Sequence, residues 1–73
     1  MEEIYEAVLP EMADINIEDT TENRAIFLQG LFDAWREDSD DSIEKSLYMM
    51  ALNAEIMSLK MQLMFRGILA KNT

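Results

Sequence analysis

Residues 43–70 carry two apolar stripes that lie on nearly opposite sides of one long helix. The first, which we call the heptad seam, consists of Ile43, Leu47, Met50, Ala54, Met57, Met61, Met64 and Ile68. Its spacing alternates four and three residues without a break, as in the a and d positions of a coiled coil. The second, which we call the opposite seam, consists of Met49, Leu52, Ile56, Leu59 and Leu63. At about 100° per residue the two seams are roughly 160° apart, so such a helix needs cover on two sides.

The first part of the chain predicts a short helix followed by an extended connector. Residues 2–9 have helical apolar periodicity, and Pro10 is expected to end this helix because proline disfavours helical geometry in the residue before it. Residues 12–18 alternate, with Ile15 and Ile17 on one side and polar side chains on the other, which favours an extended connector over residues 10–19. We expect Ile15 and Ile17 to cap the core; the alternative is pairing of this segment with a second copy or with the sheet edge of a partner.

A second helix is predicted for residues 20–36, with Asp19 as its N-cap residue. Its apolar residues fill one side of the helical wheel. Gly30 lies in the interior of this helix, where glycine is about 1 kcal/mol less favourable than alanine. Either another backbone approaches closely at this point, or the glycine is tolerated on an exposed face.

Residues 37–41 form an acidic loop, and the long helix is predicted for residues 42–70 with Asp41 as its N-cap residue. At about 1.5 Å per residue this helix is about 42 Å long, whereas helix 20–36 is about 25 Å long. A loop of this length between two helices favours an antiparallel hairpin. Residues 1–73 are therefore expected to form a single small all-α domain.

The two seams of the long helix predict self-association, because the shorter helix can cover only part of one seam. Exposure of the five large side chains of the opposite seam would forfeit roughly 7–15 kcal/mol. That is comparable with the net stability of an ordinary domain, about 5–15 kcal/mol. We therefore predict a helical-bundle homo-oligomer, with a dimer favoured. Its predicted interface consists of Met49, Leu52, Ile56, Leu59 and Leu63.

The residue types argue against an enzyme. The chain has no histidine and no cysteine, so it lacks the commonest general base, the best soft nucleophile and the ligands of ordinary zinc, haem or copper sites. No catalytic residue, cofactor or metal site is predicted. Asp38, Asp40 and Ser42 have the spacing that opens an EF-hand loop, but Ile43 and Met49 stand where that loop needs glycine and glutamate. Weak divalent-cation binding and a solvated helix connector are the two interpretations of this loop.

Charge is distributed unevenly along the chain. Residues 1–44 hold 14 of the 15 acidic residues against two arginines, a net charge of −12, whereas residues 45–73 carry +3. Acidic surfaces repel nucleic acids and anionic membranes, so we expect the chain to bind neither of them. The expected partner is a basic protein. The predicted partner-binding acids are Glu22, Asp33, Glu37, Asp38, Asp40 and Asp41. No stretch of the long helix is apolar enough to span a bilayer, and the cytoplasm is the default location.

Two functional hypotheses follow. The first is an acidic protein-interaction module that occupies a basic, nucleic-acid-binding site on another protein, as a nucleic-acid mimic does; the acidic surface alternatively serves only solubility. The second is a structural, assembly or chaperone-like component whose methionine-rich long helix covers an apolar partner surface. Those methionines alternatively fill an ordinary core. Small size, acidity and helical build look like the style of phage-encoded accessory proteins, including inhibitors of host machinery, although no motif identifies a family.

Overall fold

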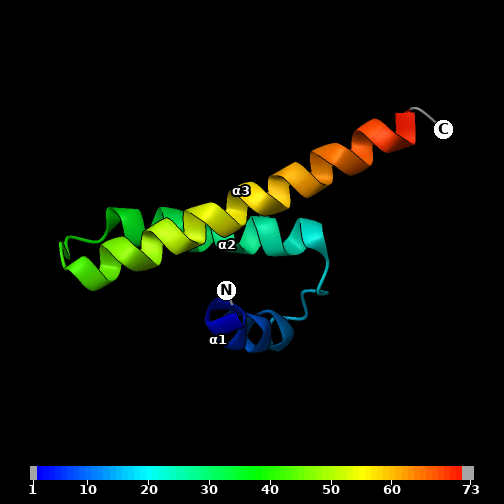
Figure 1. Ribbon diagram of the computed structural model, residues 1–73. Helices are drawn as coiled ribbons and strands as arrows, with labels where there is room; N and C mark the ends of the chain where they lie inside the picture. The colour runs from blue at the N-terminus through cyan, green and yellow to red at the C-terminus, as the bar shows by residue number, and fades with distance from the viewer. Residues whose placement is uncertain (1, 72–73) are drawn as a thin grey trace.

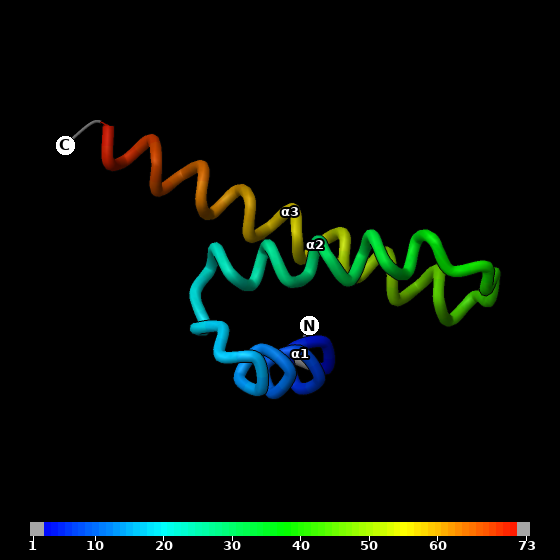
Figure 2. The backbone as a smooth tube through the Cα atoms, turned by 180° about the vertical axis from the view of Figure 1, so that it is seen from behind, coloured from blue at the N-terminus to red at the C-terminus, as the bar shows by residue number. Residues whose placement is uncertain are grey.

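A computed structural model describes residues 2–71, which form the three helices α1 (Glu2–Asp14), α2 (Thr21–Glu37) and α3 (Ile43–Lys71). No strand occurs within this range, which confirms the predicted all-helical class. α2 and α3 lie side by side, joined by a short loop at one end, and α1 packs below them (Figures 1 and 2). The molecule measures 47 × 25 × 21 Å because the C-terminal part of α3 projects beyond the other two helices.

α1 is longer than predicted, because the helix continues through Pro10 to Asp14. The prediction of a helix confined to residues 2–9 and an extended segment over residues 10–19 was therefore wrong. An interior proline removes one backbone hydrogen bond and crowds the preceding turn. This penalty is offset by burial, since Ile4, Val8 and Met12 recur every four residues and all three enter the core. Pro10 itself lies on the exposed side of the helix.

The end of α1 has the geometry of a Schellman motif. Asn16 adopts a left-handed backbone conformation with φ of 59°. The amide of Asn16 donates to the carbonyl of Ala13 at 3.1 Å, and the amide of Ile17 donates to the carbonyl of Met12 at 2.9 Å. These are the two reversed hydrogen bonds that satisfy the last carbonyls of such a helix. Ile17 packs against the core as predicted for a capping residue, whereas Ile15 is exposed.

The boundaries of α2 and α3 each differ by one residue from the predicted ranges. The N-cap residue of α2 is Thr20 rather than Asp19, because its hydroxyl accepts a hydrogen bond from the amide of Asn23 at 3.1 Å. Ser42 rather than Asp41 caps α3, with its hydroxyl accepting from the amide of Lys45 at 3.2 Å. In both cases the hydroxyl residue directly before the helix is used in place of the neighbouring aspartate.

The core is formed by all three helices. Its buried side chains are Ile4, Val8, Met12, Ala25, Leu28, Leu52, Ile56 and Leu59. Partly buried apolar side chains, including Leu31, Phe32 and Leu63, pack around them. The described residues contribute no buried polar side chain to it. The core is therefore purely apolar and lies where α1 crosses below α2 and α3.

This core corrects the predicted oligomer interface. Leu52, Ile56 and Leu59 are at most 4% exposed within a single chain, Leu63 packs on the core, and Met49 is half-buried. The opposite seam is consequently not available to a second copy. The physical reason is length: its large side chains span about 21 Å of helix, which matches the roughly 25 Å of α2, and the extended α1 completes the cover.

Gly30 in α2 has no close neighbour. A Cβ atom added at this position would meet no other atom within 4 Å. The hypothesis of close backbone approach was therefore wrong, and the glycine is tolerated on an exposed face.

Candidate protein-interaction surface

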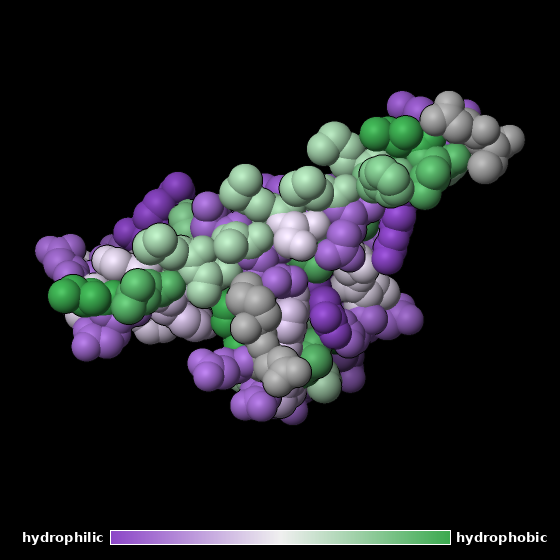
Figure 3. All heavy atoms as spheres, viewed as in Figure 1, coloured by the Kyte–Doolittle hydropathy of each residue, from purple (hydrophilic) through white to green (hydrophobic). Residues whose placement is uncertain are grey.

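The heptad seam of α3 is open along its whole length. Its seven large apolar side chains are 51–75% exposed, and Ala54 between them is exposed as well. The seam extends over residues 43–68, or about 38 Å of helix. In the space-filling view a band of hydrophobic residues follows α3 from the loop to its projecting end (Figure 3). This contiguous exposed apolar surface makes the heptad seam the candidate interaction surface of the described chain.

Four of the five methionines of α3 belong to this exposed seam: Met50, Met57, Met61 and Met64. They therefore do not fill the core of a single chain, which was one of the two interpretations of the methionine-rich helix. Methionine is flexible and polarizable, and so suits a surface that adapts to a partner.

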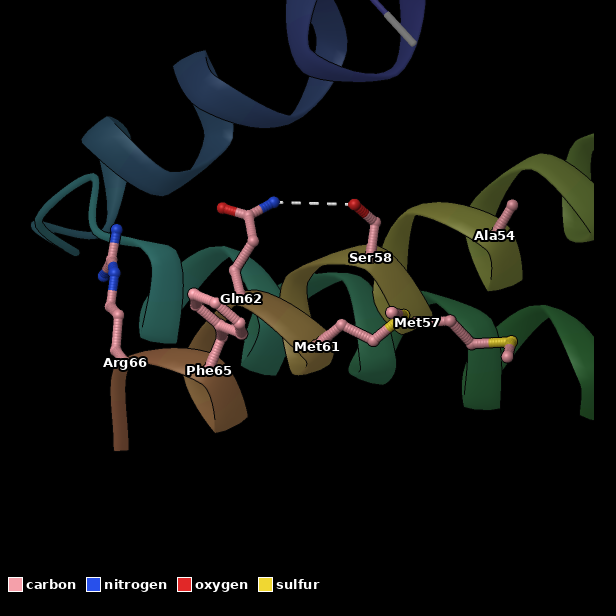
Figure 4. A pocket seen from close by; sticks show the side chains of 7 residues that line it. All are labelled: Ala54, Met57, Ser58, Met61, Gln62, Phe65 and Arg66. Carbon is pink, nitrogen blue, oxygen red and sulfur yellow. Dashed lines mark hydrogen bonds between the residues drawn. The ribbon is translucent and has the colours of Figure 1, made fainter. Parts of the chain in front are cut away.

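The residues that flank the heptad seam are almost uncharged. The eight flanking positions, e and g in coiled-coil notation, are Glu44, Ser46, Ala51, Asn53, Ser58, Lys60, Phe65 and Gly67. A shallow depression on this part of α3 is lined by Ala54, Met57, Ser58, Met61, Gln62, Phe65 and Arg66, all from the same helix (Figure 4). The depression is therefore a feature of an open helix face. It is open to solvent and does not enclose a small molecule.

The predicted partner-binding acids do not form one patch. Glu37, Asp38, Asp40 and Asp41, which we call the acidic turn, lie together where α2 passes into α3. Asp33 is one turn away on α2 and accepts a hydrogen bond from Gln29 at 3.1 Å. Glu22 lies at the other end of α2, about 22 Å from Glu37 along the helix, and faces Arg66 at 3.9 Å. The structure brings five of the six acids together and separates Glu22 from them.

Two aspartates of the acidic turn also hold its backbone. The Asp38 carboxylate accepts from the amide of Asp40 at 3.1 Å, and the Asp40 carboxylate accepts from the amide of Ser42 at 3.0 Å. The Lys45 ammonium donates to the Asp38 carbonyl at 2.6 Å. Side-chain bonds to the amide two residues later are typical of Asx turns. Glu37 and Asp41 are exposed, and both carboxylates are open to solvent and to a partner.

A polar network that the sequence analysis missed fastens α1 to the other two helices. The Arg24 guanidinium donates two hydrogen bonds to the Asp19 carboxylate, the longer one at 2.8 Å. The same guanidinium stacks on the Tyr5 ring, with its carbon 4.4 Å from the ring centroid. The Tyr5 hydroxyl in turn donates to Glu55 at 2.8 Å. We call this network the clasp; it joins the connector, α2, α1 and α3 in that order.

The electrostatics of the clasp are those of a structural network. Burial, together with the hydrogen bond to Glu55 and its negative charge, raises the pKa of Tyr5 to about 12. The Arg24 hydrogen bond lowers the pKa of Asp19. General acid–base catalysis works best with a pKa near the operating pH, and both shifts lead away from it. The clasp keeps the Tyr5 proton and the Asp19 charge in place.

Residues 2–71 contain no group of three or more acidic side chains arranged to hold a metal ion. Within the same range, none of the helices combines the length and the apolar character that crossing a membrane requires.

No protein-family model matches this chain, and neither a curated protein nor a solved structure matches it.

Proposed function

We propose that this protein is a non-enzymatic protein-interaction module. The observation that carries the proposal is the heptad seam, a row of seven large apolar side chains and Ala54 that α1 and α2 leave uncovered. Complete burial of one such side chain is worth about 1.5–3 kcal/mol, so covering the exposed part of seven of them is worth roughly 6–13 kcal/mol. This is as large as the expected net stability of the folded chain.

In this proposal α2 and α3 form an antiparallel hairpin that assembles into a homo-oligomer, while the acidic turn faces a basic protein partner. The arrangement of the acids supports this division, since Glu37 and Asp41 lie at the end of α2 and in the loop that follows it, and both side chains are exposed. A specific version is an inhibitor of the phage type, which blocks a basic nucleic-acid-binding site by presenting carboxylates where phosphates bind.

A second candidate function is favoured by the composition of the seam. Four of its seven large side chains are methionines, which adapt to different apolar surfaces. In this alternative the protein is an assembly or chaperone-like component, and the heptad seam itself covers an apolar surface of the partner. The two candidates differ in their response to salt, because charge pairs at a surface are screened and apolar contacts are not.

The test is capture of proteins from a lysate of the source cells at low and high salt. Because Asp38 and Asp40 hold the turn, the acidic variant is Glu37→Lys/Asp41→Lys. Its control is Glu6→Lys/Glu11→Lys, which changes the net charge equally on the exposed side of α1.

The inhibitor version predicts capture of a basic protein that is weakened by salt and by the acidic variant but not by its control. Any captured protein is then tested for loss of its bound nucleic acid when the module is added. Salt-resistant capture that is lost in Met57→Asp would instead support the assembly component. If capture were unchanged in both Glu37→Lys/Asp41→Lys and Met57→Asp, the inhibitor and the assembly component would both be refuted.

A further inference from the structure

The occupant of the heptad seam can be inferred from its length, its flanks and the charges at its two ends. A partner must present an apolar stripe of about 38 Å that repeats every seven residues. The chain itself carries such a stripe, and α1 and α2 pack on the other side of α3, so they do not obstruct a second copy. Only Glu44 and Lys60 are charged among the eight flanking positions. Like charges therefore do not keep two seams apart.

The ends of α3 differ in charge, and this difference selects an orientation. The loop end carries the four carboxylates of the acidic turn and Glu44 against the single ammonium of Lys45. The C-terminal end of α3 carries Arg66 and Lys71 and has no acidic residue after Glu55, and Lys60 lies further back, where it donates a hydrogen bond to Gln29 of α2 at 3.3 Å. A parallel pair would place two acidic ends together and two basic ends together. An antiparallel pair places each acidic end beside a basic end, which is favourable within the screening length of about 10 Å.

We propose that the heptad seam packs antiparallel against the heptad seam of a second copy, with Ala54 opposite Met57. This rests on the proposed function, and it names the partner of the exposed seam. In this register the other layers are Ile43 with Ile68, Leu47 with Met64, and Met50 with Met61. All eight seam positions are then paired, and every a position meets a d position, as antiparallel coiled coils require. A shift by one heptad in either direction leaves two positions of each helix unpaired.

The central layer is consistent with this register. Ala54 is the one small residue of the seam, and Met57 is a long, flexible side chain. Pairing a small with a large residue lets two helices interdigitate at their midpoint. The pairing also brings the projecting end of each α3 alongside the part of the other α3 that α2 supports from behind (Figure 1). The segment that protrudes from a single chain is thereby covered in the pair.

Disulfide trapping tests the orientation directly, because the chain contains no cysteine of its own. Leu47→Cys and Met64→Cys chains are prepared separately with tags of different mass, then mixed and oxidised. The proposed register places these two positions opposite each other, so the expected product is the mixed disulfide. In the same pair the two copies of position 47 are about 26 Å apart, too far for a bond that needs Cα atoms within about 7 Å. Disulfides between identical chains as the main product would overturn the antiparallel orientation.

Sedimentation equilibrium over the micromolar range tests the self-association itself. The expected result is a dimer whose dissociation constant rises about 100-fold or more in Met57→Asp, because an unpaired charge would be buried in the centre of the seam. Ile26→Asp is the control, since Ile26 is an apolar side chain 70% exposed on α2 and lies outside the seam. A monomer throughout the range, or equal weakening by the two variants, would overturn the proposal. A monomer would also remove the homo-oligomer from the proposed function, whereas disulfides between identical chains in a dimer would overturn the antiparallel register alone. The capture experiment separately decides whether the protein binds another protein.

Discussion

Substitution of one leucine on each side of α3 tests which side forms the core. Leu52 has 0% exposure, and Leu→Ala at such a site removes about 2–5 kcal/mol, including the cavity that remains. For 73 residues the expected free energy of unfolding is only about 4–11 kcal/mol, so Leu52→Ala removes a large share of it. Leu47 is 61% exposed, and its replacement should remove less than about 1 kcal/mol from a single chain. The change in helix propensity is the same at both positions and cancels.

The assay is urea unfolding followed by far-ultraviolet circular dichroism at several protein concentrations. The loss in Leu52→Ala should not depend on concentration, whereas the loss in Leu47→Ala should grow as chains associate through the heptad seam. If Leu52→Ala does not fold, the milder pair Ile56→Val and Ile43→Val applies, with about 0.5–1.5 kcal/mol expected for the buried site and almost none for the exposed one. Equal losses at the two sites in dilute solution would refute the assignment of the core.

Three further predictions concern α1 and its attachment. Pro10→Ala should raise the free energy of unfolding by about 1–3 kcal/mol, because it restores a backbone hydrogen bond inside α1; urea unfolding measures this, and an unchanged midpoint would contradict the helical placement of Pro10. Asn16→Val should lower it by about 1–2 kcal/mol, since a branched side chain disfavours the left-handed conformation, whereas Asn16→Gly should be tolerated. The pKa of Tyr5 is raised from 10.0 to about 12 in the folded chain, mainly by burial and then by Glu55, so the folded state holds this proton more tightly. Its contribution is full below pH 10.0 and is lost as the pH rises towards about 12. The stability advantage of the wild type over Tyr5→Phe should therefore shrink across this interval, and parallel pH curves would argue against the clasp.

The sequence predicted α2 and α3 to within one residue because their signals are local. A hydroxyl or acidic residue precedes each helix, and the apolar residues repeat with helical spacing for many turns. The end of α1 was missed because Pro10 is also a local signal, and it was outweighed by burial of Met12 against distant parts of the chain. A rule based on neighbouring residues cannot include the free energy gained when Met12 is buried against distant residues.

The main error was to predict that the opposite seam, and not the heptad seam, is left for a second copy. Comparing the lengths of the two seams with the length of α2 would have given the correct assignment. Both seams are apolar, so composition does not separate them. The opposite seam loses its large side chains after Leu63, which suits the short α2, whereas the heptad seam continues to Ile68. The clasp could not be found in this way, because Tyr5 and Glu55 are 50 residues apart and no pattern relates them.

The methionines of the heptad seam give the surface a chemical sensitivity that the core does not share. Peroxide converts an accessible thioether to a sulfoxide, which is polar and can be reduced again by dedicated enzymes. Met50, Met57, Met61 and Met64 are accessible in a single chain, whereas Met12 is 1% exposed. Oxidation would therefore turn the seam hydrophilic while sparing the interior, and occupation by another helix would slow it. The rate of sulfoxide formation at these four residues, relative to Met12, reports whether the seam is covered.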